Sequence, residues 1–556
     1  MRIERKWFVM VIVLCLALGA LLAGCTSKES SETVENETES NESNENSQNS
    51  EKPQITSSIY DRGSVPAAEG SIEDNRWTKW IKQNGPVNVK YQPIPRWEST
   101  EKFNTLFASG QAPDLLFEYS AGPKDTWYQQ KQLMPLGEII EEHSTDYKQM
   151  LEDYPALRKA GTLSDGKLYF LGRLNEITPI RAMFVRKDWL DKLNLEVPET
   201  TEELYQVAKA FTEQDPDGNG EDDTYGIAIS HQSARTIDQV FQNMGFVMRN
   251  DQIVRAWDSA VEATKFRKRL YQEGIVDRDY LNDNNGEKAR KDFVTGKLGI
   301  YPLLLKWDQF AKNELKSLKQ NVPEAEIIPI AYPESPAGSF NPTYQNPVQM
   351  TAAVSRGAKN PEAVIKFVDF LVKPSTANML NFGEEGVHHE LDGNGCPKIM
   401  DGEHNEEVGY MTDATMLSSS SFVTEGKCGY ETMFNPEIPN EKEGLELYEM
   451  SREVYFDLSR PYSEITHSEH MPQLPKELDI TLGQTGASID ELWVKAIVSG
   501  SDYTVEQALK DAKKIWQNGR GPDAEQWWSD WYAENKDSAF LAKDIYGIVE
   551  QQQAQK

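Results

Sequence analysis

From about residue 55 onward, short apolar runs alternate with longer stretches in which apolar residues recur every three or four positions. The short runs predict strands, and the longer stretches predict helices. This alternation is typical of α/β folds, in which helices cover the faces of a sheet. The predicted strands cover residues 55–60, 87–94, 114–119, 181–186, 296–302 and 327–331.

The predicted helices are bounded by residues that commonly start and stop helices. Thr200-Thr201-Glu202-Glu203 resembles a helix start, because a threonine can cap the first turn and acidic residues favour it. About five hundred residues follow the N-terminal segment, which is more than one hydrophobic core usually supports, so we expect at least two lobes. Helices are predicted over residues 75–83, 103–109, 188–193, 200–211, 260–273 and 361–372, with more between 489 and 543.

The first 24 residues have the pattern of a secretory signal. Three basic residues precede an apolar run over 7–18, and Leu22-Ala23-Gly24-Cys25 follows. This ending looks like a bacterial lipobox, which predicts a lipoprotein signal peptide over 1–24 and lipidation of Cys25. The alternative is a retained membrane helix, because the run from 7 to 23 is near the lower length limit for a span. Either way, the rest of the chain is expected outside the cytoplasm.

Residues 25–52 predict a disordered acidic tether. After Cys25 this segment holds eight Glu and two Lys, and Val34 is its only aliphatic residue. Such a composition cannot bury enough apolar surface to offset the entropy of ordering. We expect the tether to hold a folded body away from the membrane.

Charge and cysteine content narrow the possibilities further. The net charge of -31 argues against nucleic acid as a partner, because phosphate contacts need clustered Lys and Arg. No later apolar stretch approaches spanning length, which predicts a soluble body.

Cys396 and Cys428 remain once the signal and Cys25 are set aside. In an oxidising exterior they predict a disulfide, the alternative being two unpaired thiols.

Seven short blocks occur in an order that points to one protein family. Leu106–Leu115 reads LFASGQAPDL, Phe184–Leu190 reads FVRKDWL and Pro198–Leu204 reads PETTEEL. In their order and spacing the blocks resemble the extracellular solute-binding proteins of ABC importers, family 1, and especially the larger LplA-like or alginate-binding-like members. The remaining blocks lie at 132–136, 165–169, 293–299 and 381–386.

The resemblance implies an α/β fold of the periplasmic-binding-protein type (type II), with two lobes and a cleft between them. Lobe 1 would take residues 53–135 and 340–390. Lobe 2 would take 136–335 and 444–556, with the C-terminal helices shared. The lobe that holds residues 391–443 is left open.

The resemblance also implies a function. A monomeric lipoprotein on the outer face of the cell membrane would capture a carbohydrate or oligosaccharide and deliver it to the permease of an ABC importer. Because an unanchored protein would be lost from a single-membrane cell, we expect a Gram-positive-type host. The alternatives are a secreted glycan-degrading enzyme and a sensor module that presents its ligand to a membrane receptor.

Six residues are candidates for ligand contacts. Trp307 follows a predicted strand and, by its position in the family, would face the cleft, where an aromatic ring suits a sugar. The alternative for each candidate is ordinary packing. The other five lie at or soon after strand ends, where α/β lobes bind ligands: Tyr60, Arg62, Tyr119, Trp127 and Arg186.

Residues 215–223 read DPDGNGEDD and place oxygen ligands at alternate positions around glycines, as calcium loops do. The pattern matches the first half of an EF-hand loop, but position twelve is Gly226 rather than Glu. Alginate-binding-like members carry a calcium loop of similar pattern here. We therefore expect a structural Ca²⁺, the alternative being a solvated acidic turn. Its ligands would be Asp215, Asp217, Asn219, Glu221 through its backbone oxygen, and Asp223.

Signals for catalysis are weak. Gly161–Lys167 has the glycine and lysine spacing of a phosphate-binding loop, but Leu168 stands where Ser or Thr would hold Mg²⁺. The histidine pairs at 388–389 and 467–470 lack the spacing of a zinc-protease helix. The sequence therefore predicts a binding protein and not an enzyme.

Overall fold

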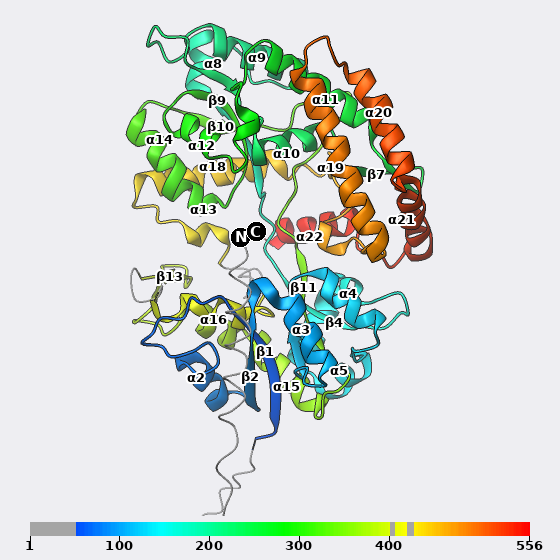
Figure 1. The fold of residues 1–556 in the computed structure, drawn as a ribbon. Helices are drawn as coiled ribbons and strands as arrows, with labels where there is room; N and C mark the ends of the chain where they lie inside the picture. The colour runs from blue at the N-terminus through cyan, green and yellow to red at the C-terminus, as the bar shows by residue number, and fades with distance from the viewer. Residues whose placement is uncertain (1–51, 401–405, 420–427, 556) are drawn as a thin grey trace, which may run out of the picture. The chain divides into compact units, whose positions relative to one another are not determined.

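The computed structural model describes residues 52–400, 406–419 and 428–555. The predicted signal peptide, Cys25 and the tether up to Glu51 lie outside this part. Lys52–Lys556 forms one compact unit, in which two lobes each enclose a sheet and a hydrophobic core (Figure 1). In the described part of the chain, no helix has the length and apolar character needed to cross a membrane.

The sheet of lobe 1 has the strand order β2-β1-β3-β11-β4. β1 pairs in parallel with β2 and β3, whereas β11 runs antiparallel to both β3 and β4. The carboxyl ends of β1, β2, β3 and β4 therefore share one edge with the start of β11. The strands are β1 (Gln54–Asp61), β2 (Asn88–Pro95), β3 (Leu115–Phe117), β4 (Phe170–Leu174) and β11 (Val348–Val354).

Helices pack against this sheet and bury its apolar side chains in the first core. α2 begins at a capping box, in which the Asn75 side chain accepts hydrogen bonds from the backbone of Trp77 and Thr78. These helices are α2 (Arg76–Asn84), α3 (Ser99–Ala108), α4 (Ala121–Gln129), α5 (Gly137–His143), α6 (Asp146–Asp153), α7 (Pro155–Gly161), α15 (Pro361–Val372) and α16 (Pro374–Phe382).

Lobe 2 has a sheet of order β10-β5-β9-β6. β5 runs antiparallel to β9, so its first residue lies at the same edge as the end of β9, and its last residue lies at the opposite edge. The strands are β5 (Arg181–Arg186), β6 (Tyr225–Ile227), β9 (Leu298–Leu304) and β10 (Ile327–Pro329), and a separate hairpin holds β7 (Phe246–Arg249) and β8 (Gln252–Arg255).

The helices of lobe 2 include the one predicted from its capping residues. Thr200 accepts a hydrogen bond from the backbone of Glu203, whose carboxylate accepts one in return from Thr200. They are α8 (Lys187–Leu193), α9 (Thr201–Glu213), α10 (His231–Val240), α11 (Trp257–Gln272), α12 (Glu287–Val294), α13 (Trp307–Phe310), α14 (Lys316–Asn321) and α18 (Pro439–Tyr455).

The lobe boundaries differ from those expected. Residues 136–177 belong to lobe 1 rather than lobe 2, because β4 completes the lobe 1 sheet before the chain crosses. Residues 391–443 divide between the lobes. Residues 408–417 pack into the first core, whereas Phe434 packs into the second.

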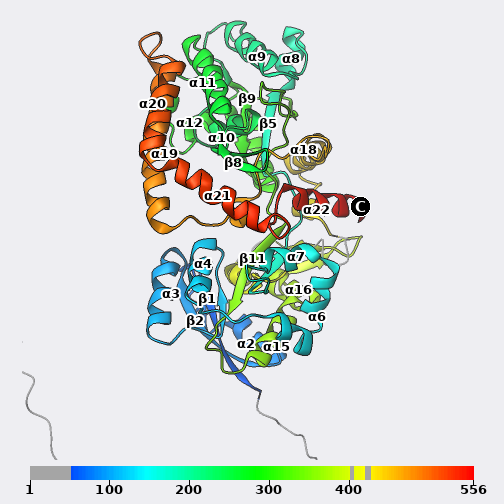
Figure 2. The same ribbon diagram turned by 90° about the vertical axis from the view of Figure 1, so that its right-hand side faces the viewer.

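The C-terminal helices are shared between the lobes. α19 (Lys476–Val498), α20 (Val505–Asn518) and α21 (Gly521–Asn535) lie along one side of lobe 2, against α11 and the β7–β8 hairpin (Figure 2). α22 (Ala542–Gln555) returns to lobe 1 and buries Ile545 and Ile548 in the first core.

Hydrogen bonds fasten the segments that cross between the lobes. The Gln552 side chain of α22 accepts from the backbone N–H of Ile177 at 2.9 Å and donates to the backbone oxygen of Asn175 at 3.3 Å. The Tyr344 hydroxyl donates to the backbone oxygen of Tyr455 at 2.6 Å. The backbone N–H groups of Asn175 and Gln345 donate to the oxygens of Pro347 and Thr178 at 3.0 and 2.9 Å, so hydrogen bonds join the separate crossings.

His470 lies in this hinge with its Nε2 2.9 Å from the side-chain oxygen of Asn346. Burial, aided by nearby His467 and Lys124, lowers the pKa of His470 to about 3. Because an unfolded histidine titrates near pH 6.5, acid protonates the unfolded state first. The stabilisation is therefore full above about pH 6.5 and is lost as the pH falls towards 3.

We expect His470→Gln to remove this pH dependence. Between pH 7 and pH 5 the wild-type free energy of unfolding should fall by about 2 kcal/mol more than that of the variant, because only the wild type has this histidine to protonate. Urea unfolding at both pH values measures it. Asp125, whose pKa burial raises to about 6, acts in the opposite direction in both proteins. Equal pH dependence in both proteins would contradict the prediction.

Candidate ligand-binding site

The edge of the lobe 1 sheet that faces the crossings carries aromatic and charged side chains. Arg62 follows β1, Tyr119 follows β3, and Arg96 and Trp97 follow β2 in a short 3-10 turn, η1 (Arg96–Glu98). Because β1 pairs in parallel with both neighbours, these segments leave the sheet side by side. In α/β lobes this is the edge at which ligands bind.

Asp413 organises the charged part of this edge. It lies in η4 (Gly409–Thr415), and its carboxylate accepts hydrogen bonds from Arg62 at 2.6 and 3.0 Å and from the Tyr119 hydroxyl at 3.2 Å. Burial, aided by the negative charge of Asp413, raises the pKa of Tyr119 to about 12. The Tyr119 hydroxyl therefore stays protonated at neutral pH and remains a donor.

The aromatic side chains at this edge end in the exposed ring of Trp97. Tyr60 stacks on Tyr119 with ring centroids 5.8 Å apart, and the Arg96 guanidinium lies 4.8 Å from the Tyr60 centroid. Arg96 also lies 5.3 Å from the centroid of Trp97, whose side chain is 83% exposed. Tyr60 is buried and supports the stack, whereas Trp97 presents an indole to solvent. We refer to Arg62, Arg96, Trp97, Tyr119 and Asp413 as the edge cluster.

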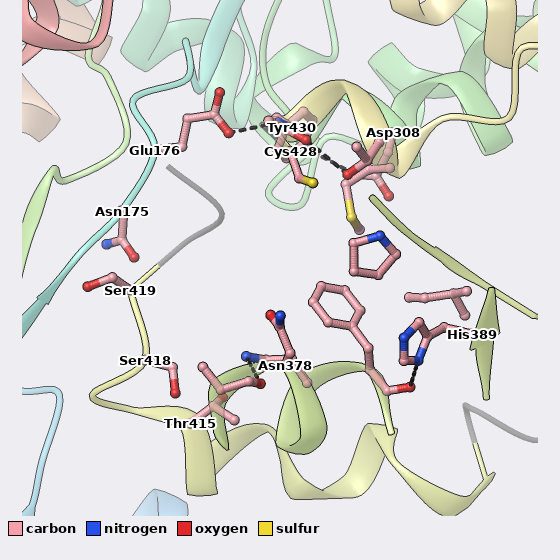
Figure 3. Close-up of a pocket in the computed structure, with 18 of the residues that line it drawn as sticks. Asn175, Glu176, Asp308, Asn378, His389, Thr415, Ser418, Ser419, Cys428 and Tyr430 are labelled. Carbon is pink, nitrogen blue, oxygen red and sulfur yellow. Dashed lines mark hydrogen bonds between the residues drawn. The ribbon is translucent and has the colours of Figure 1, made fainter. Parts of the chain in front are cut away.

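A pocket of about 1050 Å³ lies between the lobes. Lobe 1 contributes α16 and residues 415–419, lobe 2 contributes residues 305–309, and the crossing at 173–180 forms one wall. Figure 3 shows polar side chains around the cavity, including those of Asn175, Asn378 and Ser418. The pocket thus meets both lobes and the hinge.

Two carboxylates in this pocket hold one aromatic residue. Tyr430, in η5 (Tyr430–Met433), donates its backbone N–H to Glu176 at 2.7 Å and its hydroxyl to Asp308 at 2.6 Å (Figure 3). Burial and the carboxylate of Asp308 raise the pKa of Tyr430 well above its usual value. The phenol is therefore neutral and fixed in orientation.

Apolar side chains complete the pocket. Leu391, Ile399 and Met433 line it and are 38–47% exposed, so they offer apolar surface to a bound molecule. Phe382 adds a partly exposed ring. A cavity with apolar surface and several fixed polar groups is the usual form of a site for a small organic molecule.

Comparison with known proteins identifies the family of this chain. A family described as bacterial extracellular solute-binding protein matches residues 66–378, more than half of the sequence. The chain belongs to this family. The polygalacturonan/rhamnogalacturonan-binding protein YtcQ of Bacillus subtilis (strain 168) is similar to this solute-binding protein, with 25% identity over 75% of this chain and 80% of YtcQ.

Two solved structures share the fold of this solute-binding protein. The substrate-binding protein FusA of S. pneumoniae, in complex with kestose, superposes with a TM-score of 0.61 at 19% identity, over 87% of this chain and 99% of FusA. The alginate-binding protein AlgQ2, without calcium ion, superposes with a TM-score of 0.58 at 20% identity, over 87% of this chain and 98% of AlgQ2. Both likenesses confirm the predicted two-lobe α/β architecture.

Trp307 lies in the pocket wall but does not present its ring. Its side chain is 1% exposed, and its indole N–H donates to the backbone oxygen of Pro179 at 2.7 Å. Phe184 and Tyr448 pack against the ring at centroid distances of 5.7 and 5.8 Å. The residue therefore supports the wall, and the expectation that it offers a stacking face for a sugar is wrong for this conformation.

Two other candidates lie away from the site. Trp127 is buried between Phe103 and Phe107 in the lobe 1 core. Arg186 ends β5 at the edge far from the crossings, where it pairs with Asp188 at 2.6 Å. The strand-end argument fails for Arg186 because β5 is antiparallel to β9, so the end of β5 points away from the cleft.

Cys396 and Cys428 form a disulfide, as the sequence predicts. Cys396 lies in the hairpin of β12 (His389–Leu391) and β13 (Pro397–Ile399), which is held to lobe 1 by His389, 3.1 Å from the backbone oxygen of Phe382. Cys428 leads into Tyr430, which is bonded to Asp308 of lobe 2. The disulfide thus links the two lobes along the side of the pocket.

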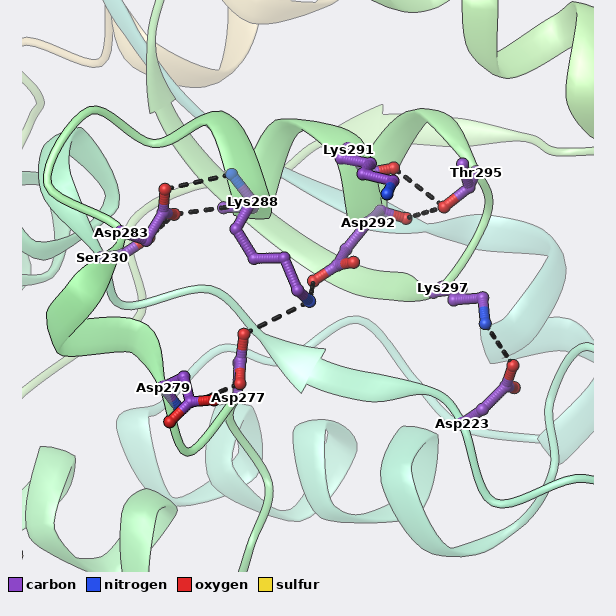
Figure 4. Close-up of polar contacts among 11 residues, drawn as sticks. Asp223, Ser230, Asp277, Asp279, Asp283, Lys288, Lys291, Asp292, Thr295 and Lys297 are labelled. Atoms are coloured by element: carbon purple, nitrogen blue, oxygen red, sulfur yellow. Dashed lines mark hydrogen bonds and ion pairs between the residues drawn. The ribbon is translucent and has the colours of Figure 1, made fainter.

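The acidic loop lies in lobe 2, remote from the pocket. Asp215 accepts hydrogen bonds from the backbone of Gly218, Asn219 and Gly220 at 3.0–3.1 Å. The Asn219 side chain donates to Asp217 at 2.9 Å and to Asp223 at 3.1 Å. Lys297 pairs with Asp223, close to a second network around Lys288 (Figure 4).

These hydrogen bonds and the ion pair with Lys297 thus fix the shape of the loop. In the described residues no group of three or more His, Cys, Asp or Glu has a metal-binding arrangement. The donor chemistry nevertheless suits a hard cation, because the Asn219 side chain lies within hydrogen-bond distance of both Asp217 and Asp223.

Sequence reasoning missed Arg96, Trp97 and Asp413. The first two follow a predicted strand and were open to the argument that found Arg62 and Tyr119. Asp413 lies 351 residues from Arg62, and no local pattern marks that pairing.

We expect the double substitution Cys396→Ser and Cys428→Ser to loosen the pocket. The disulfide closes a loop with a sequence separation of 32 residues, so its loss should lower the free energy of unfolding by about 3–4 kcal/mol. Hydrogen exchange should increase at residues 389–399 and 428–433, because the cross-lobe link is gone. Unchanged exchange at both segments would contradict the prediction.

Proposed function

We propose that this protein captures an oligosaccharide outside the cell and delivers it to an ABC importer. Membership of the solute-binding family supports capture, and the pocket that meets both lobes is the observation on which the proposal rests. The names of two relatives support a carbohydrate: YtcQ is a polygalacturonan/rhamnogalacturonan-binding protein, and the FusA structure contains kestose.

The lining of the pocket suits a sugar. Hydroxyl groups need both donors and acceptors, which the Asn, Ser and Thr side chains and the fixed carboxylates supply. The C–H faces of a sugar ring need apolar surface, which Phe382, Met433 and the hairpin residues Leu391 and Ile399 supply. Since most polar residues of the lining are Asn, Gln, Ser and Thr, orientation would come mainly from neutral hydrogen bonds.

The charges favour a neutral sugar over a uronate. The lining holds three acidic residues (Glu176, Asp308 and Glu385) and two basic residues (Arg173 and Lys306). Arg173 already donates to Gln349 at 2.9 Å and lies 3.4 Å from the backbone oxygen of Thr415. A carboxylate of the ligand that lies within this pocket would therefore meet more like charge than opposite charge.

The edge cluster would hold a further part of a longer ligand. Trp97 offers an exposed indole face, and Arg62, Arg96 and Tyr119 supply donors beside it. The lobe 1 sheet places β4, which leads into the pocket, and β2, which leads into Trp97, at its two sides. Four strand spacings of about 4.8 Å separate them, roughly 19 Å, which favours a chain of several sugar rings.

We predict that neutral oligosaccharides bind more tightly than oligogalacturonates of equal length. Titration calorimetry of residues Lys52–Lys556 against both series measures this. Trp97→Ala should weaken binding of long neutral chains about tenfold, because it removes a stacking face worth roughly 1 kcal/mol or more. Disaccharides, which cannot span both regions, should bind equally to variant and wild type.

Two variants serve as controls. Trp97→Tyr keeps an aromatic face and should retain most of the affinity, and Ile480→Ala removes an exposed apolar side chain from α19. Tighter binding of oligogalacturonates would contradict the proposal that the ligand is neutral. If Trp97→Ala binds long oligosaccharides as tightly as the wild type does, Trp97 is not part of the binding site.

Delivery requires a change of lobe position. The ligand would bind the closed state more tightly than the open one, so that closure and capture are coupled. The permease would then recognise the closed, monomeric protein.

A hydrolase would instead cleave the sugar, so recovery of intact oligosaccharide after prolonged incubation separates the two functions. A sensor would bind but not support uptake, which an uptake assay in a deletion strain decides.

The location is also a proposal. The family is extracellular, and a relative named lipoprotein LipO, of Bacillus subtilis (strain 168), supports a lipid anchor. Cys25 would carry the lipid and residues 26–52 would form the tether to the outer face of the cell membrane. Membrane fractionation of cells that express the wild type or Cys25→Ser tests this proposal.

We further propose that the acidic loop binds a structural Ca²⁺. Asp215, Asp217, Asn219 and Asp223 would supply side-chain oxygens, and Glu221 its backbone oxygen. Binding would require the Asn219 amide to turn its oxygen inward and Lys297 to leave Asp223. The ion would join α9 to β6 and would lie away from the ligand.

Calcium removal should therefore lower stability without altering ligand contacts. We expect EGTA to lower the midpoint of thermal unfolding by several degrees relative to calcium. In Asp217→Asn the midpoints with calcium and with EGTA should be equal, because the substitution removes one anionic ligand. Glu213→Gln, a change of equal charge on neighbouring α9, should keep the calcium effect. Identical midpoints with calcium and with EGTA would contradict the proposal.

A further inference from the structure

Lobe 1 contains a second cavity, of about 710 Å³, that is separate from the ligand pocket. Three turns surround it: the turn after α4, which carries Lys131, the turn before β4, which carries Asp165 and Lys167, and the turn after β11, which carries Arg356. None of these residues lines the ligand pocket.

The cavity lies at the edge of the sheet opposite the edge cluster. β11 ends there, and the backbone N–H of Ser355 donates to the oxygen of Asp114 just before β3. Asp114 in turn bonds to Thr56 near the start of β1. The chain therefore enters the body at Gln54 on the same edge that carries the cavity.

The lining of this cavity is basic in a strongly acidic protein. Lys131, Lys167 and Arg356 face one acidic residue, Asp165, whereas the whole chain has a net charge of -31. Asp165 is occupied, because its carboxylate accepts from the Tyr169 hydroxyl at 2.8 Å and from the backbone of Lys167 at 3.2 Å. Within the described residues, no ion pair or side-chain hydrogen bond engages the three basic groups.

Backbone contacts fix the turns that present these groups. The N–H of Lys131 donates to the oxygen of Tyr128 at 2.9 Å, and Lys131 itself has a left-handed backbone with φ of 56°. The oxygen of Lys167 accepts from Leu163 at 3.0 Å, and the N–H of Arg356 donates to Gln132 at 2.7 Å. Three like charges are thus gathered from distant parts of the chain with no counter-charge of equal size.

Two tyrosines form the wall between the basic groups. The rings of Tyr128 and Tyr169 meet edge to face with centroids 5.0 Å apart. Thr162 and Leu168 form a β-bridge, so the segment Gly161–Lys167 is a hairpin turn and not a nucleotide-binding loop at a helix start. It nevertheless brings Lys167 to the cavity.

We propose that this cavity binds a phosphate group. Phosphate carries nearly two negative charges and three acceptor oxygens, which two ammonium groups and one guanidinium can match. A single carboxylate would leave two of the three cations without a partner. The phosphate can come from a soluble compound or from a lipid headgroup that carries a phosphomonoester. The second source rests on the proposed lipid anchor, because the cavity lies at the edge where the chain enters the body.

The test uses the compact body, Lys52–Lys556, at low ionic strength. Calorimetry with inorganic phosphate and with malonate, a dicarboxylate, measures anion binding. Flotation with vesicles that contain phosphatidic acid, a phosphomonoester lipid, compared with vesicles of phosphatidylcholine alone, measures lipid binding. We expect phosphate to bind more tightly than malonate, and we expect flotation only with phosphatidic acid if the source is a lipid.

The decisive variant is the triple substitution Lys131→Ala, Lys167→Ala and Arg356→Ala. It should weaken anion binding about a hundredfold, since each cation near an anionic surface contributes about fivefold. The control is a triple of equal charge change on exposed positions of α20 and α22: Lys510→Ala, Lys513→Ala and Lys543→Ala. It should bind as the wild type does.

Several outcomes decide the proposal. Binding of phosphate without flotation supports a soluble phosphate compound, and binding of both supports a lipid headgroup. The proposal would be overturned if phosphate did not bind or if malonate bound with equal affinity. It would also be overturned if both triple variants lost the same affinity for phosphate. If the triple variant does not fold, the phosphate affinity of the single variant Lys167→Ala, which changes an exposed turn residue, is compared with that of the wild type. Oligosaccharide affinity should be unchanged in all variants.

Discussion

The pairing of β11 between β3 and β4 is the constraint on which the molecule depends. β11 begins more than 170 residues after β4 ends, so it can complete the lobe 1 sheet only after the chain has built most of lobe 2. The chain must therefore cross between the lobes on both sides of lobe 2. Those crossings lie beside the ligand pocket, so the strand order of one sheet fixes where the pocket can be.

The same pairing shows what local sequence can and cannot predict. β5 and α15 have the bounds expected from the sequence, because a continuous apolar run and a proline start are local signals. β4 and β11 were not predicted. β4 carries Gly172 and Arg173 within five residues, and β11 has two Ala and a Gln among its seven residues, so neither has a strong strand pattern. Their structure comes from pairing with each other, which is a long-range effect.

The candidate site was partly predictable for a related reason. Arg62 and Tyr119 follow parallel strands, and the parallel pairing brings them together, as the strand-end rule requires. Arg186 also follows a strand, but the rule depends on strand direction, which residue patterns do not give. Trp307 was placed in the correct wall, yet whether a ring faces a cavity or a neighbour depends on packing. Phe184 and Tyr448 decide that packing, and they lie far from Trp307 in sequence.

The disulfide has a consequence for when the pocket forms. In the reducing cytoplasm Cys396 and Cys428 would stay as thiols, so the hairpin wall on lobe 1 and the Tyr430 segment on lobe 2 would be joined only through the chain itself. Oxidation outside the cell adds the covalent join. Full assembly of the pocket thereby depends on an oxidising environment, because only there do the two walls share a covalent bond.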